Sequence, residues 1–136
     1  MTYALSYVSF LVVFAAMDAV WLGTNSNSLY RATLGDIMLE NLKILPGVVF
    51  YLMYPIGIVV FASVPALKSG SVVPALTYGA LFGFLAYGTY DLTNLATLRN
   101  WSVQLTVLDM AWGTFASAVA SAASYFIVRS VLAWWG

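Results

Sequence analysis

Three aspartates lie within long apolar stretches of this sequence, where a carboxyl group is costly. Asp18, Asp91 and Asp109 each have mainly hydrophobic neighbours along the chain. Inserting a charged side chain at the centre of a hydrocarbon layer costs roughly 2.5–3.5 kcal/mol. A carboxyl group kept there can bind a cation, exchange a proton or accept hydrogen bonds from a neighbouring helix. These residues are therefore the first candidates for a functional site.

Aromatic and amide side chains accompany the aspartates at helical spacing. Tyr87 and Asn94 precede and follow Asp91 by about one helical turn, which places them on one helix face. A tryptophan follows each of the other two aspartates by a similar interval. We expect Asp91 and Asp109 to supply charge or protons and the other side chains to shape a pocket. The predicted binding residues are Asp18, Trp21, Tyr90, Asp91, Asn94, Asp109 and Trp112.

The composition excludes several other kinds of site. Five basic and five acidic side chains give a net charge of zero, so there is no basic field to hold nucleic acid. The chain has no cysteine and no histidine. Disulfides, thiol catalysis, zinc sites built on these residues and histidine-ligated haem are thereby excluded. Because no metal-binding spacing or phosphate loop is recognisable either, we expect no metal site and no cofactor.

The same composition is typical of an integral membrane protein. Hydrophobic residues make up 62% of the chain and charged residues only 7%, whereas about a quarter of a soluble domain is charged. Four apolar runs each exceed the roughly 20 residues that a helix needs to cross the hydrocarbon layer. A spanning backbone must satisfy its own hydrogen bonds, and without period-2 alternation this indicates helices. The sequence predicts a single all-α transmembrane domain over residues 1–136, with spans at about 3–23, 44–66, 72–98 and 102–133.

Short connections between the later spans predict their arrangement. Only a few residues separate the second span from the third and the third from the fourth, which favours an antiparallel four-helix bundle. In that topology Asp18 lies roughly 7 Å, and Asp91 and Asp109 roughly 10 Å, from the ends of their spans. These ends all face the same side of the membrane. The three carboxyl groups are therefore predicted to lie at similar depth in one leaflet.

The segment 24–43 is the one sizeable polar stretch. Leu34, Met38 and Leu42 recur near helical spacing and alternate with charged residues. This pattern predicts a short amphipathic helix along the membrane surface, above the carboxyl groups. An ordinary connecting loop is the alternative.

Features at the ends of the spans bear on membrane insertion. No basic segment precedes the first apolar run and no small-residue cleavage pattern ends it, so it does not resemble a removable signal peptide. Basic residues are slightly more numerous on the side of the 24–43 and 99–101 connections. The positive-inside rule favours that side as cytoplasmic by a small margin.

Several stretches of the chain resemble a known family. They are Asp18-Ala-Val-Trp21-Leu-Gly23, Tyr90-Asp91-Leu-Thr-Asn94, Trp101 and Asp109-Met-Ala-Trp112-Gly113. Together they resemble the bacterial membrane proteins grouped as domain of unknown function 2177, over essentially the whole chain. The resemblance implies a multi-pass protein of the bacterial inner membrane with four spans, and it implies no particular reaction.

Three hypotheses for function follow from these residues. We favour a protein that binds or transfers a small amphiphile, a lipid head group or a cation in the acidic pocket. The second hypothesis is an intramembrane lipid-modifying enzyme that uses an aspartate pair as general acid and base or as Mg²⁺ ligands. The third is an accessory subunit, in which the polar cluster only fixes helix register within a larger complex. Expected partners are membrane lipids and a second copy or a larger membrane complex.

Overall fold

The computed structural model describes residues 1–135, and all regular structure in this range is helical. Helix α1 (Thr2–Asn25) continues through a π-helical turn, η1 (Ser26–Arg31), into α2 (Ala32–Leu34) and a 3₁₀ turn, η2 (Gly35–Ile37). A second helical run consists of α3 (Ile44–Ile58), η3 (Val59–Ser63) and α4 (Val64–Ser69). Helices α5 (Val73–Thr97) and α6 (Val103–Trp135) complete the fold. The prediction of an all-helical chain is confirmed.

The segment after α1 differs from its prediction. No break separates a surface helix from the first span as far as Leu34. Gly35, with φ of 56°, ends this continuous run, a single 3₁₀ turn follows to Ile37, and residues 38–43 are bent or irregular. The last two side chains of α1 bond back to carbonyl groups of the same helix: Thr24 Oγ1 donates to Val20 O at 3.0 Å and Asn25 Nδ2 to Trp21 O at 3.0 Å. The hydrogen-bonding groups of these side chains are thereby satisfied within the helix, which continues past them.

Prolines shape the second helical run. Pro55 lies inside α3, and Pro65 lies in the first turn of α4. Because proline lacks an N–H group and its ring crowds the preceding turn, it disturbs the regular helical ladder. The π-helical turn η3 lies between the two prolines.

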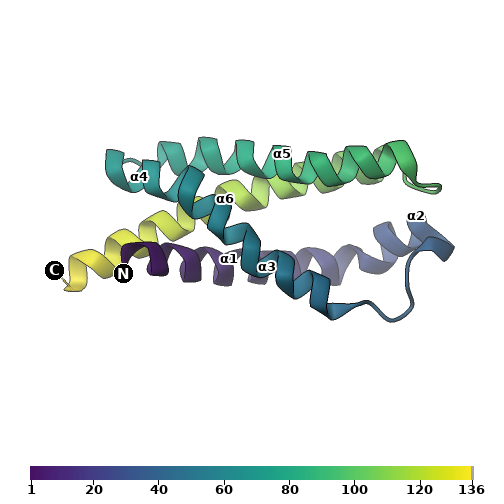
Figure 1. The fold of residues 1–136 in the computed structure, drawn as a ribbon, viewed down its shortest axis with the longest axis horizontal. Helices are drawn as coiled ribbons and strands as arrows, with labels where there is room; N and C mark the ends of the chain where they lie inside the picture. Colours follow the sequence, from purple (N-terminus) through teal and green to yellow (C-terminus); the bar gives the residue numbers. More distant parts are fainter. Residues whose placement is uncertain (136) are drawn as a thin grey trace.

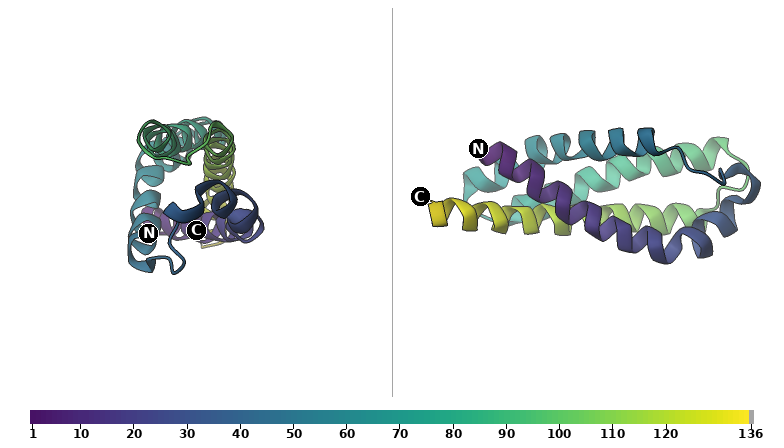
Figure 2. Two further views of the ribbon diagram at one scale, coloured as in Figure 1. Left: turned by 90° about the vertical axis from the view of Figure 1, so that its right-hand side faces the viewer. Right: turned by 90° about the horizontal axis from the view of Figure 1, so that it is seen from below.

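The long helices lie side by side and alternate in direction, with both termini at one end (Figure 1). Seen end-on they form a square in which α1 packs on α6, α6 on α5, α5 on η3, and α3 on α1 (Figure 2). Three helical runs are long and apolar enough to cross a membrane: Thr2–Ile37, Ile44–Ser69 and Val103–Trp135. Helix α5 has 25 residues but is less apolar, because it carries several tyrosines, threonines and glycines.

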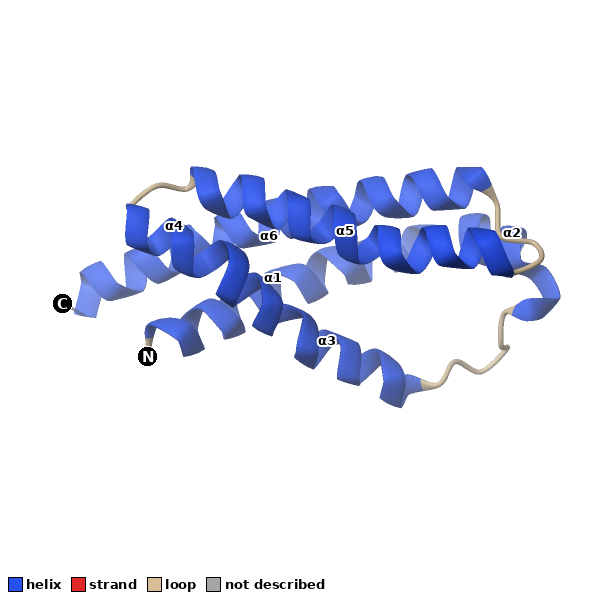
Figure 3. Cartoon of the chain, turned by 45° about the horizontal axis from the view of Figure 1, so that its top comes forward, coloured by secondary structure: helices blue, strands red, loops and turns tan. Residues whose placement is uncertain are grey.

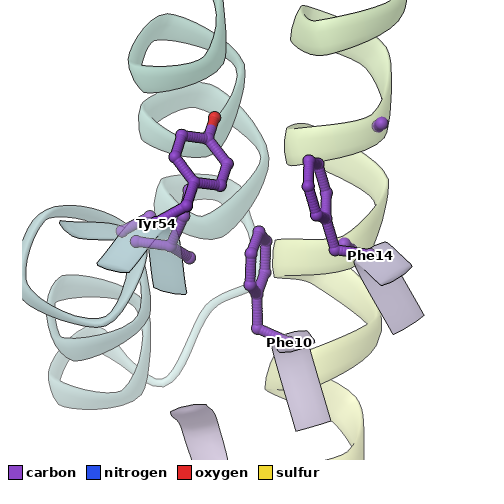
Figure 4. Close-up of a cluster of buried hydrophobic side chains, with 7 residues drawn as sticks. Phe10, Phe14 and Tyr54 are labelled. Atoms are coloured by element: carbon purple, nitrogen blue, oxygen red, sulfur yellow. The ribbon is translucent and has the colours of Figure 1, made fainter. Parts of the chain in front are cut away.

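An aromatic core fills the middle of the square. Phe10 and Phe14 of α1 are fully buried, and their rings stack with centroids 5.2 Å apart. Tyr54 of α3 packs on both rings and forms a 2.6 Å hydrogen bond with Ser117 of α6 (Figure 4). This core closes the interior of the bundle between its two ends.

The first half of α3 stands apart from the other helices. Figure 3 shows it leaving the bundle towards the 38–43 connection, and every residue from 44 to 50 is exposed. Farther along, Gly57 lies against the ring of Phe82 from α5, so close that an added Cβ would meet it at 2.3 Å. Helices α3 and α5 therefore meet near Gly57 and separate towards the 38–43 end.

Glycine and serine residues bring α5 and α6 into close contact. A Cβ on Gly79 would lie 2.7 Å from Ser121 Oγ, and a Cβ on Gly83 would lie 2.5 Å from the backbone oxygen of Gly113. Small residues let helices approach in this way within a membrane, where apolar burial alone gives little association.

We expect Gly83→Ala to destabilise the protein because the backbone oxygen opposite cannot move aside as a side chain does. A loss of about 1–3 kcal/mol is typical of overpacking. Thermal unfolding in detergent measures it. Gly47→Ala is the matched control, since a Cβ there meets nothing within 4 Å. Equal stability of the two variants would contradict the close packing of α5 on α6.

Candidate functional site

Asp18 joins three helices through its side chain. It is 7% exposed on α1 and accepts a hydrogen bond from Trp112 Nε1 of α6 at 3.0 Å. Its other carboxylate oxygen accepts a hydrogen bond from the Tyr51 hydroxyl of α3. Hydrogen bonds to the charged form stabilise a buried carboxylate and offset part of its lost hydration.

Asp109 is held by the segment that follows α1. The Tyr30 hydroxyl in η1 donates a hydrogen bond to Asp109 Oδ1, and Trp21 Nε1 donates to the Tyr30 oxygen at 2.9 Å. The π-helical turn places Tyr30 over α6, where it packs with Trp101 and Leu105. Single π-helical turns are often found at functional sites.

A tryptophan pair connects the two carboxylate groups. The rings of Trp21 and Trp112 stack with centroids 4.8 Å apart and planes only 5° from parallel. Trp112 donates to Asp18, and Trp21 reaches Asp109 through Tyr30. The two hydrogen-bonded sets therefore form one rigid aromatic and acidic unit across α1, α3 and α6.

Asp91 differs from the other two aspartates. It is 0% exposed on α5, and neither carboxylate oxygen has a hydrogen-bond partner among the described residues. The close contacts of Gly83 with Ser117 and of Gly113 with Tyr87 set the register of α5 against α6. Tyr87 of α5 lies opposite Gly113 of α6, and the two helices are antiparallel. One helical turn closer to the 98–102 connection, Asp91 therefore lies opposite Asp109. The register therefore places the two carboxyl groups next to each other on facing helices.

Two neighbouring buried carboxyl groups require a proton or a cation between them. Ionised carboxylates only accept hydrogen bonds, so a bond between two of them requires one to be protonated. In a low-dielectric interior, like charges at this range share a proton or a cation.

A cavity of about 340 Å³ lies beside these carboxyl groups. Its wall contains two carboxylates together with aromatic and small apolar side chains. The lining residues are Asp18, Leu22, Tyr30, Phe50, Ala86, Tyr87, Tyr90 and Asp109. Phe50 and Tyr90 are 41% and 55% exposed, so they form its outer rim on α3 and α5. The volume is within the usual range for small-molecule sites.

A contact from the α5–α6 connection holds the segment above the cavity. Asn100 Nδ2 donates to Leu34 O at 2.9 Å and to Asp36 Oδ1 at 3.1 Å. Asn100 itself has φ of 69°, a left-handed conformation that asparagine tolerates better than most residues. Leu34 is half-buried, whereas Ile37 and Leu42 are exposed, so the predicted apolar face of this segment is not buried as a whole.

The structure places the seven predicted residues in different situations. Asp18, Trp21, Asp109 and Trp112 form the hydrogen-bonded unit, with Asp91 beside Asp109. Tyr90 lies on the cavity rim with its ring edge against Trp101. Asn94 is half-buried, and among residues 1–135 its side-chain amide has no hydrogen bond to these carboxylates and does not line the cavity.

Two residues that bond directly to the carboxylates were not among the predicted site residues. Tyr30 lies in a polar stretch, and its contact depends on the helix continuing past residue 25. Tyr51 lies at the start of an apolar run, and sequence spacing alone does not show which helix its hydroxyl meets. The sequence did offer one indication of these contacts: both tyrosines lie near the end of an apolar run that is predicted to face the same side as the aspartates.

The donor set indicates what this arrangement can bind. Two aspartates and three tyrosines line the cavity, and no basic side chain lines it among the described residues. No group of three acidic side chains in residues 1–135 is arranged to hold a metal ion. The chemistry therefore suits a polar or positively charged organic group that meets carboxylates and aromatic rings together.

Comparison with known proteins identifies one family. The family described as "Predicted membrane protein (DUF2177)" matches residues 3–126. This match confirms the resemblance drawn from the stretches around Asp18, Asp91 and Asp109. No curated protein and no solved structure is significantly similar to the chain.

The register of α5 and α6 predicts that Asp91 and Asp109 are energetically coupled. In a double-mutant cycle for unfolding, Asp91→Asn and Asp109→Asn should deviate from additivity by about 0.5–3 kcal/mol. Asp18→Asn combined with Asp91→Asn is the control and should be additive within about 0.5 kcal/mol, because Asp18 has its own donors. Additive losses in both cycles would mean that Asp91 and Asp109 act independently.

Proposed function

The chain belongs to the DUF2177 family of predicted membrane proteins, and from this we propose that it is a bacterial inner-membrane protein that binds a small amphiphile in its acidic cavity. The amphiphile's polar head group would lie between Asp18 and Asp109, and Trp21, Trp112 and Tyr90 would shape the site. The observation that carries the proposal is a cavity whose two carboxylates lie beside an exposed aromatic rim.

All four helical runs would cross the bilayer, including α5. Its 25 residues span about 37 Å, more than the roughly 30 Å hydrocarbon layer. The threonine hydroxyls of α5 donate to carbonyl groups one turn earlier, as at Thr77, Thr89 and Thr97, which lowers their cost in lipid. Its glycines face α6. The segment 26–37 would then lie at the membrane surface above the cavity.

The shape of the cavity favours an amphiphile over an ion path. The aromatic core around Phe14 and Tyr54 closes the bundle below it. Helix α3 separates from α5 at the same end, so that the rim residues Phe50 and Tyr90 face the hydrocarbon region. A molecule in the membrane could enter sideways with its chain against these rings and its head group against the carboxylates.

The two rival functions make different demands on the same residues. A lipid-modifying enzyme would use Asp91 and Asp109 as acid and base, but Asp91 is fully enclosed and does not line the cavity. An accessory subunit would need the carboxyl groups only as contacts between helices, which Asp18 resembles most closely. Binding accounts best for the open rim, and a homodimer or larger complex is compatible with it.

The four-span topology predicts opposite accessibility for two serines. Because the parent chain has no cysteine, single cysteines at Ser28 and Ser69 can be labelled in intact cells with a membrane-impermeant maleimide. Both positions are exposed. We expect one to be labelled only from outside and the other only after lysis. Labelling of both from the same side would rule out the four-span arrangement.

The binding proposal predicts that a specific amphiphile remains with the purified protein. Native mass spectrometry of protein extracted in mild detergent should show a bound molecule, and Asp109→Asn should reduce its occupancy by about tenfold. Glu40→Gln removes an exposed carboxylate outside the cavity and should leave occupancy unchanged. Equal occupancy in all three proteins would show that retention does not involve the cavity.

A further inference from the structure

The charges around the cavity do not balance. Three buried carboxyl groups, Asp18, Asp91 and Asp109, lie on or next to its wall. No Lys or Arg is among the residues that line it. Burying a carboxylate without a partner is very unfavourable, so missing positive charge must come from protons or from a ligand.

The three carboxyl groups differ in the number of hydrogen-bond donors that they receive. Asp18 receives two donors and Asp109 receives one. Asp91 receives none, although its carboxyl group is completely enclosed and beside that of Asp109. The lack of positive charge is therefore concentrated at the Asp91–Asp109 pair.

We propose that the cavity recognises an ammonium head group, which enters in exchange for a proton shared by Asp91 and Asp109. This rests on the amphiphile-binding function above and names its ligand class. In the empty protein the shared proton leaves the pair with one negative charge. When R–NH₃⁺ binds in the cavity against Asp109, the shared proton passes to water, and the ammonium then offsets the charge of the fully ionised pair through Asp109, the member that lines the cavity. No bond other than O–H is broken, and each ligand bound releases one H⁺.

The aromatic surroundings favour an organic cation. The cavity wall presents the rings of Tyr30, Tyr87 and Tyr90 next to the carboxylates. The faces of such rings attract ammonium groups, by about 2 kcal/mol or more where water is excluded. Asp18 and Asp109 belong to separate hydrogen-bonded sets and do not converge with Asp91 on one point. This separation suits a group larger than a bare metal ion.

Calorimetric titration of the purified wild-type protein with hexylamine tests both parts of the proposal. Hexylamine is an ammonium ion at pH 7, and hexanol is its neutral counterpart of similar size. We expect hexylamine to bind at least about tenfold more tightly. Repeating the titration in two buffers of different ionisation enthalpy counts the protons released, and we expect about one per hexylamine bound.

Substitutions at the two aspartates test whether the released proton comes from the Asp91–Asp109 pair. Asp91→Asn should still bind hexylamine but release close to no proton, since no pair remains to share one. Asp109→Asn should weaken binding by about tenfold or more, and Glu40→Gln should match wild type. Because the wild-type titrations decide the question by themselves, misfolding of a variant does not rescue the proposal.

The source of the ammonium group is decided in nanodiscs. Because anionic phosphatidylglycerol attracts hexylammonium by itself, each titration is corrected for the hexylamine taken up by protein-free nanodiscs of the same lipid. Corrected binding that is weaker in phosphatidylethanolamine than in phosphatidylglycerol would mean that a lipid head group competes for the site and supports a lipid ligand. Equal binding in both would support a free amine.

The failures are distinguishable. If neither hexylamine nor hexanol binds, the amphiphile-binding function itself is contradicted. If both bind equally, that function stands and the ammonium specificity is wrong. If hexylamine binds tightly without releasing protons, the exchange at Asp91 and Asp109 is wrong.

Discussion

A carboxyl group enclosed by a helical bundle must obtain hydrogen-bond donors from other helices, because no water replaces them. In this protein that requirement determines how one end of the bundle is assembled. Asp18 accepts hydrogen bonds from Tyr51 of α3 and Trp112 of α6. Asp109 accepts one from Tyr30 in the segment beyond α1. The stacked tryptophans then lock the two sets together. The contacts that make the buried charge tolerable are also those that build the cavity wall.

The close approach of α5 and α6 has a second consequence at the same end. Their glycine and serine residues fix the register of the two helices with backbone contacts that leave little freedom. Continued towards the 98–102 connection, this register brings Asp91 against Asp109, and α5 supplies no donor to either. Among the described residues 1–135, the tight packing that stabilises the bundle therefore leaves the buried carboxyl group of Asp91 without a hydrogen-bond donor.

The two ends of α3 differ in how closely they pack against the other helices. Its Gly57 end packs against Phe82, and with Tyr54 it belongs to the closed core. Its first turns stand away from α5, and the rim of the cavity is left exposed there. The bundle is therefore closed by side-chain packing below the cavity and open at the rim of the cavity.

Much of this protein follows from the sequence alone. Apolar runs too long for anything but helices, the short links between them and the positions of three aspartates already predict the helical class and a polar cluster at one end. The pairs Asp18–Trp21 and Asp109–Trp112 were identified as site residues because spacing along one helix is fixed by its own backbone.

Other features depended on contacts between helices, which spacing does not encode. The helical run continues past residue 25 as far as Leu34, and this continuation brings Tyr30 to Asp109. Asn94 shares a helix face with Asp91, yet the α5–α6 register turns Asp91 towards Asp109 and leaves the amide without a bond to the carboxylates. The sequence by itself determined which residues are polar and where each lies along its own helix. Only tertiary structure decided which of them meet, because the partners come from different helices whose rotation and register are set by packing.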